Sequence, residues 1–165
     1  KLSEGGVYDF AGHPVNVIHT PGHTLGHIAY YLPQDGVAFV GDTMFALGCG
    51  RVFEGTLDQM WGSLQKLAAL PDETVVYCGH EYTESNFRFA MTIDGSNPAL
   101  VARGEEIRKL RAAGKPTVPT TIAAEKATNP YLRADDPAVR AALNMPTAPA
   151  SDVFGAIRTA KDNFK

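Results

Sequence analysis

Short apolar runs separated by turn residues fill the first half of the chain. Residues 28–32 and 37–40 are two such runs, and residues 33–36 between them contain an Asp-Gly pair, which is typical of a hairpin turn. This pattern predicts two antiparallel strands. The second strand would deliver Asp42 at its far end, and residues 45–50 would follow as a loop.

Another pair of short strands is predicted earlier, over residues 7–19. The turn between them falls at residues 12–14, which read Gly-His-Pro. Val15, Val17 and His19 would then alternate on one face of the second strand, because side chains two residues apart point the same way.

Helical spacing begins at Thr56, which can cap a helix over residues 56–70. Asp58 favours its first turn because a negative charge offsets the helix dipole. Apolar residues recur at helical intervals, at Leu57, Met60, Trp61, Leu64, Leu67 and Ala68. Trp61 is interpreted as a core residue. Residues 74–78 then predict a buried strand that leads to His80.

Beyond residue 83 the pattern becomes almost entirely helical. Turns that contain Gly or Pro separate five predicted helices, over residues 87–91, 99–112, 122–127, 137–143 and 152–164. Apart from residues 116–119, little here is typical of a strand. We therefore expect an α/β (α+β) chain of two domains. Residues 1–85 would combine a sheet with a helix, and residues 86–165 would form a small all-helical domain.

Composition narrows the possible partners. The chain has 165 residues, of which 44% are hydrophobic and 20% charged, as in ordinary globular proteins. A net charge of -3 gives no basic excess to neutralise phosphates, so nucleic acid is not expected as a partner. No apolar run approaches the roughly 20 residues that span a bilayer. A membrane partner is not expected either.

Three short clusters carry candidate metal chemistry. Each places a metal-competent side chain directly after a glycine that follows a strand-like run, at Gly22-His23, Gly41-Asp42 and Gly79-His80. Imidazole suits zinc and iron, and an Asp can lend one oxygen to each of two ions. The glycines allow tight turns where the ligands project. A single cluster would be weak evidence for a metal site, but the three together predict one at one edge of a sheet.

Two other histidines lie near the first cluster. His19, His23 and His27 are four residues apart, which would place them on one face of a helix, as in zinc-binding helices. Pro21 and Gly22 between them disfavour a helix. We therefore interpret His19 and His27 as structural residues or as supports for the ligands.

The two cysteines, Cys49 and Cys78, both lie beside glycines near the predicted site. A disulfide framework is not expected, and a reducing compartment is plausible. Either cysteine could in principle bind metal, but we interpret both as small buried hydrophobes. Cys49 could alternatively act as a nucleophile that forms an acyl-enzyme, although the sequence places no suitable base beside it.

Several motifs together resemble the glyoxalase II enzymes, the hydroxyacylglutathione hydrolases of the metallo-β-lactamase superfamily. The similarity covers nearly the whole chain. The motifs are Thr20-Pro21-Gly22-His23-Thr24, Gly41-Asp42-Thr43, Gly48-Cys49-Gly50-Arg51, Gly79-His80-Glu81-Tyr82-Thr83, Asn129-Pro130-Tyr131-Leu132-Arg133 and residues 158–165. The resemblance implies the second half of an αββα sandwich, followed by a helical substrate-binding domain.

The resemblance also implies a reaction and a metal site. The reaction would be hydrolysis of the thioester S-D-lactoylglutathione, and of other 2-hydroxyacylglutathiones, to glutathione and D-lactate during methylglyoxal detoxification. It would use a hydroxide held between two divalent metal ions, zinc or alternatively iron or manganese. His23 and His80 would be metal ligands. Asp42 would bridge the two ions and serve as the catalytic residue.

Substrate contacts follow from the same resemblance. Glutathione carries two carboxylates, which basic side chains must bind. Arg51 would take part, and Phe53 stands where many relatives have Tyr, so a phenolic hydroxyl is lost. The other implied contacts are Tyr82, Arg158 and Lys161. Arg158 and Lys161 are three residues apart on the last predicted helix, where basic residues also offset the helix dipole. Residues 129–133 would organise the domain interface.

One part of the family pattern is missing. Full-length members carry a Thr-His-x-His-x-Asp-His run that supplies most metal ligands, and the five histidines here include no His-x-His pair. The chain is therefore expected to be a C-terminal fragment of an active parent. The alternative is a non-catalytic, metal-poor module that binds one ion or none. It would associate with the missing N-terminal half or with itself through an uncovered sheet face. The expected compartment is the cytoplasm, or the mitochondrion if a lost N-terminus carried an address.

Overall fold

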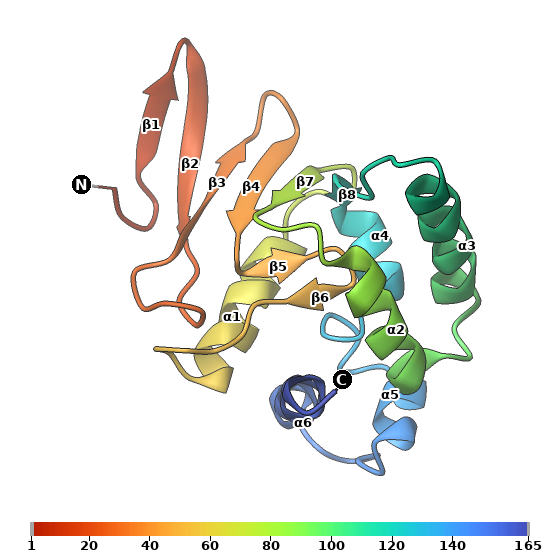
Figure 1. Ribbon diagram of the computed structural model, residues 1–165. Helices are drawn as coiled ribbons and strands as arrows, with labels where there is room; N and C mark the ends of the chain where they lie inside the picture. Colours follow the sequence, from red (N-terminus) through yellow and green to blue (C-terminus); the bar gives the residue numbers. More distant parts are fainter. Residues whose placement is uncertain (1, 165) are drawn as a thin grey trace.

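A six-stranded sheet forms the centre of the computed structural model, which describes residues 2–164. Figure 1 shows the strands side by side in the order β1-β2-β3-β4-β7-β8. Their bounds are β1 (Val7–Phe10), β2 (His13–His19), β3 (Ile28–Leu32), β4 (Val37–Gly41), β7 (Val75–Cys78) and β8 (Thr120–Thr121). Lys1 and Lys165, the outer ends of the two expected domains, lie outside the described residues.

Strand direction determines which residues meet at the edges of the sheet. The predicted hairpin is confirmed, because β3 and β4 pair antiparallel with Tyr30 opposite Phe39. β4 and β7 pair in parallel, with Phe39 opposite Tyr77. The segments that follow β4 and β7 therefore leave the sheet at the same edge. Asp42 and His80 lie on these two segments.

Helix α1 (Leu57–Ala68) covers one face of the sheet. Its start is the predicted one, since the Thr56 side chain accepts a hydrogen bond from the Gln59 N–H and Gln59 returns one to the Thr56 N–H. Met60, Leu64 and Leu67 are fully buried against sheet residues Ala29, Ala38, Val40 and Val76. This packing fixes the sheet beneath the predicted site.

The remaining helices lie beside β7 and β8 and below the sheet in Figure 1. They are α2 (Thr83–Asp94), α3 (Pro98–Ala112), α4 (Ile122–Thr128), α5 (Pro137–Ala142) and α6 (Ala150–Asp162). All five predicted helices are present, although α2 begins four residues before the predicted residue 87. The two-residue strand β8 lies in the region expected to hold helices, and it pairs with β7. The division at residues 85 and 86 stays a prediction.

The prediction of a loop over residues 45–50 is wrong. This segment belongs to a second small sheet, in which β5 (Met44–Phe45) pairs antiparallel with β6 (Gly48–Cys49). All four strand residues are buried. The hairpin extends from the sheet edge toward α2 and α4 (Figure 1), whose polar side chains bind its backbone. These long-range bonds explain why the local sequence pattern did not reveal it.

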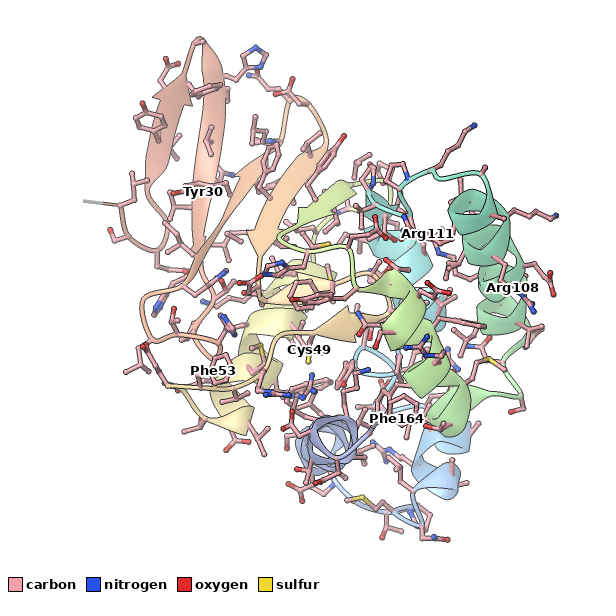
Figure 2. The ribbon with its side chains drawn as sticks, in the orientation of Figure 1. Tyr30, Cys49, Phe53, Arg108, Arg111 and Phe164 are labelled. Carbon is pink, nitrogen blue, oxygen red and sulfur yellow. The ribbon has the colours of Figure 1, made fainter. Side chains whose placement is uncertain are left out.

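The sheet face opposite α1 is apolar, and it is open at β1, β4 and β7, where Tyr8, Phe10, Phe39 and Tyr77 are exposed. Val17 pairs with Tyr30, whose side chain is labelled in Figure 2, and Tyr30 pairs with Phe39. The Phe39 and Tyr77 rings stack with their centroids 5.4 Å apart, and both side chains are exposed.

No helix within residues 2–164 is long and apolar enough to cross a bilayer.

We expect the isolated 165-residue chain to self-associate through this open face, because exposed apolar patches of this kind favour association. Phe39→Lys should shift the chain toward monomer in sedimentation velocity runs over a range of concentrations. Val101→Lys is the matched control, since Val101 is an exposed apolar residue on α3, away from the sheet. A wild-type chain that stays monomeric at every concentration would contradict this expectation.

Candidate functional site

One cavity of about 520 Å³ opens between the sheet edge, the β5–β6 hairpin and α6. All eight residues that the sequence singled out for metal or substrate line it. The full lining is His23, Asp42, Phe45, Cys49, Arg51, Phe53, His80, Tyr82, Ser85, Asn86, Arg158 and Lys161. In Figure 2, Cys49 lies at the end of β6, on the side of the hairpin that faces α6, and Phe53 lies on the segment that follows β6. The individual roles of these residues stay predictions.

Asp42 stands at the centre of the metal-competent group. Its Oδ1 lies 3.3 Å from His80 Nε2, and its Oδ2 lies 3.5 Å from His23 Nε2. The parallel pairing of β4 and β7 explains the approach of His80, because the Gly79 N–H donates to the Gly41 carbonyl over 2.9 Å. Each carboxylate oxygen therefore faces one imidazole.

His23 comes from the segment between β2 and β3, and residues 51–55 hold it in place. The Phe53 N–H donates to the His23 carbonyl over 3.4 Å. The His23 Nδ1 lies 2.8 Å from the Arg51 carbonyl oxygen. A carbonyl can only accept, so Nδ1 carries a proton and Nε2 is the nitrogen left to bind a metal ion. That nitrogen faces Asp42.

Two glycines are required beside Asp42. Gly41 has φ +50°, and a Cβ there would lie 2.7 Å from His27 Nε2. Gly79 has no positive φ, but a Cβ there would lie 2.6 Å from Asp42 Oδ1. The predicted need for glycine at these positions therefore has different causes, a left-handed backbone at Gly41 and close approach at Gly79.

His27 supports Asp42 from behind. The Asp42 N–H donates to His27 Nε2 over 3.1 Å, so Nδ1 holds the proton and donates to the Thr20 or Thr43 hydroxyl, at 2.8 and 3.0 Å. Burial lowers the pKa of His27, which favours this neutral form. His19 instead contacts the Leu25 carbonyl through Nε2 at 2.8 Å. The two histidines thus have the supporting and structural positions that the sequence favoured.

The donor set suits a divalent metal ion. Two imidazole nitrogens and a carboxylate are ligands that zinc, iron and manganese accept. Asp42 Oδ1 is buried and has no hydrogen-bond partner among residues 2–164, as an oxygen reserved for a cation would be. Within the same residues no group of three or more His, Cys, Asp or Glu side chains forms a complete ligand set. Each side of Asp42 offers one nitrogen and one oxygen.

The opposite wall of the cavity is cationic. Its basic residues, Arg51, Lys161 and Arg158, differ in how exposed they are and in how many of their nitrogens already donate hydrogen bonds. Arg51 is 58% exposed, and its Nε donates to Asp162 over 3.2 Å, while its two terminal nitrogens have no hydrogen-bond partner among residues 2–164. Lys161 donates to the Ser85 carbonyl over 3.3 Å and lies 5.2 Å from the ring centroids of Phe89 and Phe164. Burial lowers the pKa of Lys161.

Arg158 is buried, and its terminal nitrogens already donate to protein groups. Its side chain is 7% exposed, Nη1 donates to the Cys49 carbonyl over 3.0 Å, and Nη2 donates to Asp162 over 3.1 Å. Its guanidinium also lies 5.5 Å from the Tyr131 ring centroid. Arg158 therefore joins α6 to strand β6 and forms part of the cavity wall.

Aromatic rings complete the wall near His80. Tyr82 stacks on His80 with centroids 4.8 Å apart and planes 16° apart. The Phe45 ring lies 5.9 Å from His80 and 5.3 Å from Tyr82. Sequence reasoning missed Phe45 because it assigned residues 45–50 to a loop. It also missed Ser85 and Asn86, whose only sequence signal is their position three and four residues after Tyr82.

Both cysteines have free thiols, as expected. Cys49 is buried, and burial raises the pKa of its thiol to about 11. Burial also raises the pKa of Cys78, whose thiol donates to the His80 carbonyl over 3.3 Å. A thiol that resists ionisation is a poor nucleophile, which disfavours covalent catalysis by Cys49.

Comparison with known families matches the two halves of the chain separately. Residues 1–80 match the metallo-beta-lactamase superfamily, and residues 81–164 match the C-terminus of hydroxyacylglutathione hydrolase. Hydroxyacylglutathione hydrolases from Roseobacter denitrificans and Maricaulis maris are 60% and 57% identical over 164 residues, which is 99% of this chain. The chain spans 64% of the length of each of these relatives.

Solved structures are similar to the chain at lower sequence identity. ETHE1 from Myxococcus xanthus is 27% identical, with a TM-score of 0.57 over 97% of this chain and 58% of that protein. TTHA1623, solved in a di-iron-bound form, is 28% identical, with a TM-score of 0.52 over 79% of this chain and 47% of that one. These matches extend over both the sheet and the helices of the chain.

Proposed function

Since the chain belongs to the hydroxyacylglutathione hydrolase family of the metallo-β-lactamase superfamily, we propose that it takes part in hydrolysis of glutathione thioesters. The substrate is S-D-lactoylglutathione or a related 2-hydroxyacylglutathione, and the products are glutathione and a 2-hydroxy acid. The proposed role is methylglyoxal detoxification. The chain spans 64% of its relatives' length, so the activity is that of the protein that includes it.

A single observation carries this proposal. The metal-competent group and the cationic wall open onto one cavity of about 520 Å³, large enough for a tripeptide thioester. The thioester carbonyl would lie near Asp42, and the glutathione carboxylates would lie toward Arg51 and Lys161. The terminal nitrogens of Arg51 suit a carboxylate bound by two hydrogen bonds.

We assign His23, Asp42 and His80 as ligands of the divalent ions, with Asp42 between them. Bound ions of this kind lower the pKa of water and polarise a carbonyl oxygen. His23 contributes Nε2 because the Arg51 carbonyl fixes its Nδ1 proton. His80 is oriented by its stack on Tyr82. We propose two ions, which are zinc or alternatively iron or manganese.

The other residues bind the substrate and exclude water. Phe53 lies 5.1 Å from the His23 ring and provides an apolar surface at the cavity rim. Phe45 covers the space beside His80. Tyr82 is half exposed and offers a hydroxyl to the substrate. No Ser or Cys nucleophile is needed, which agrees with the raised pKa of Cys49.

His27→Phe should weaken zinc binding by about 10- to 100-fold, because it removes the acceptor that fixes the Asp42 N–H while keeping a ring in place. Competition with a chromophoric chelator measures this affinity. His19→Phe is the matched control, since His19 contacts the Leu25 carbonyl rather than Asp42. Equal zinc affinities for the two variants would show that His27 does not position Asp42.

The proposed activity is tested by following thioester loss from S-D-lactoylglutathione at 240 nm. The protein is expressed with whatever sequence its gene encodes before Lys1, and it is loaded with zinc, iron or manganese in separate samples. We expect turnover that a chelator abolishes and that returns with metal. Arg51→Met should raise KM more than it lowers kcat, because Arg51 binds the substrate away from the reacting carbonyl. Metal-loaded protein without turnover of any glutathione thioester would refute the proposal.

A further inference from the structure

The turn of the β5–β6 hairpin has a backbone that its own sequence does not favour. Phe45 pairs with Gly48, so Ala46 and Leu47 form a two-residue turn, and Leu47 has φ +60°. Only glycine adopts this left-handed conformation without steric cost. Leu47 is held there because its side chain is completely buried against α2 and α3, among Ala90, Leu100 and Ile107.

Polar side chains from the helical region bind the backbone of this turn. The Leu47 N–H donates to Glu125 Oε2 over 2.8 Å. The Asn86 amide donates to the Ala46 carbonyl over 3.1 Å, and the Asn129 amide donates to the Gly48 carbonyl over 3.0 Å. Three residues that are 40 to 81 positions distant in sequence thus bind one turn.

Glu125 is the centre of this arrangement. It is completely buried, and its carboxylate also accepts from the Thr120 hydroxyl over 2.7 Å and from the Asn129 amide over 2.9 Å. Burial raises its pKa, which these donors partly offset. A buried carboxyl group is costly unless its oxygens are satisfied. Here three donors satisfy them, one of which is the turn itself.

The hairpin transmits this anchoring to the cavity. Phe45, directly before the turn, contacts both members of the His80–Tyr82 stack. On the other strand, the Cys49 carbonyl accepts from Arg158. A shift of the turn would therefore move the surface against which His80 and Tyr82 rest.

We propose that Glu125 and Asn129 are positioning residues for the candidate site, which hold the β5–β6 turn so that Phe45 fixes the His80–Tyr82 stack. The kinetic part of this inference rests on the proposed function, but its geometric part does not. Residues 129–133, which were predicted to organise the domain interface, would thus also position the candidate site.

Two substitutions at Glu125 separate hydrogen bonding from charge. Glu125→Gln keeps an oxygen for the Leu47 and Asn129 N–H groups, and its amide can donate to the Thr120 hydroxyl. Glu125→Leu has a similar size but accepts nothing. We expect about a tenfold loss of kcat/KM for Glu125→Leu and near wild-type values for Glu125→Gln, because small misplacements at a site are costly.

A second readout does not require activity. The ring protons of His80 lie against the Tyr82 face, so their NMR shifts report the stack directly. In metal-free protein, Glu125→Leu should move these signals toward their positions in Phe45→Ala. The same change made in the Phe45→Ala background should cause no further shift, since Phe45 is the proposed link.

Controls distinguish positioning from lost stability. Arg133→Met breaks the ion pairs of Arg133 with Asp94 and Asp136 in the helical region without touching the hairpin. It should destabilise the fold yet leave the His80 signals and kcat/KM near wild type. If Glu125→Leu does not fold, Asn86→Ala removes another bond to the same turn, the one to the Ala46 carbonyl, and its His80 signals should shift in the same direction.

The outcomes separate the two proposals. His80 signals that respond to Glu125→Leu in a protein without thioesterase activity would support positioning and refute the proposed function. Turnover in the wild type, with unchanged His80 signals and kcat/KM in Glu125→Leu, would overturn the positioning role. Equal changes in Arg133→Met and Glu125→Leu would also overturn it, because the effect would then follow from general destabilisation.

Discussion

Asp42→Ala should lower thioester turnover by at least about a thousandfold and remove most of the bound metal, because both oxygens that face His23 and His80 are lost. No neighbouring acid can replace them, since within residues 2–164 no other carboxylate lines the cavity. Metal content by mass spectrometry and kcat on the same sample measure the two effects. The fold should survive, because Asp42 follows β4 rather than packing in the core.

The controls for Asp42→Ala test charge and general damage separately. Asp42→Asn keeps the shape but turns one acceptor into a donor, so it should lose metal almost as completely. Asp35→Ala removes a carboxylate from the β3–β4 turn, where it contacts His13, and should change neither quantity. Full metal content and turnover in Asp42→Ala would exclude Asp42 as a ligand.

Arg158→Met should destabilise the chain by about 3 kcal/mol, because it leaves the buried Cys49 carbonyl without a donor and removes the link between α6 and β6. Burial of the guanidinium beside the Tyr131 ring adds packing that Met replaces only in part. Urea unfolding measures the free energy of unfolding, and a two-state midpoint shift without a change in slope would match this expectation.

Arg108→Met is the matched control for Arg158→Met. Arg108 is an exposed helical arginine, labelled in Figure 2, that pairs with Glu105 at the surface. It should change stability by less than about 0.5 kcal/mol. An unchanged unfolding midpoint in Arg158→Met, together with a raised KM, would show that Arg158 binds substrate rather than supporting the cavity wall.

Local patterns predicted the elements that place Asp42. The Asp-Gly turn and the apolar runs on either side of it predicted β3 and β4, and the Thr56 cap with its apolar stripe predicted α1. These signals are reliable because neighbouring residues create them. The clusters around Asp42 and His80 also showed which residues the parallel strands β4 and β7 bring to one edge.

Long-range contacts explain what the patterns missed. The β5–β6 hairpin depends on Glu125 and Asn129, about 80 residues away, and on a left-handed Leu47 that no local rule favours. The early start of α2 was also hidden, because Tyr82 at its N-cap makes no side-chain capping bond. The burial of Arg158 follows from its packing against β6, which helical spacing alone does not reveal.

His23, Asp42 and His80 are proposed to hold metal ions beside the cationic wall of the cavity. Anomalous diffraction at the zinc edge, on crystals soaked with zinc and an S-substituted glutathione, tests this proposal most directly. We expect anomalous peaks within about 2.2 Å of His23 Nε2, His80 Nε2 and the Asp42 oxygens, with glutathione carboxylates against Arg51 and Lys161. Peaks only at other side chains, or glutathione bound outside this cavity, would contradict the account.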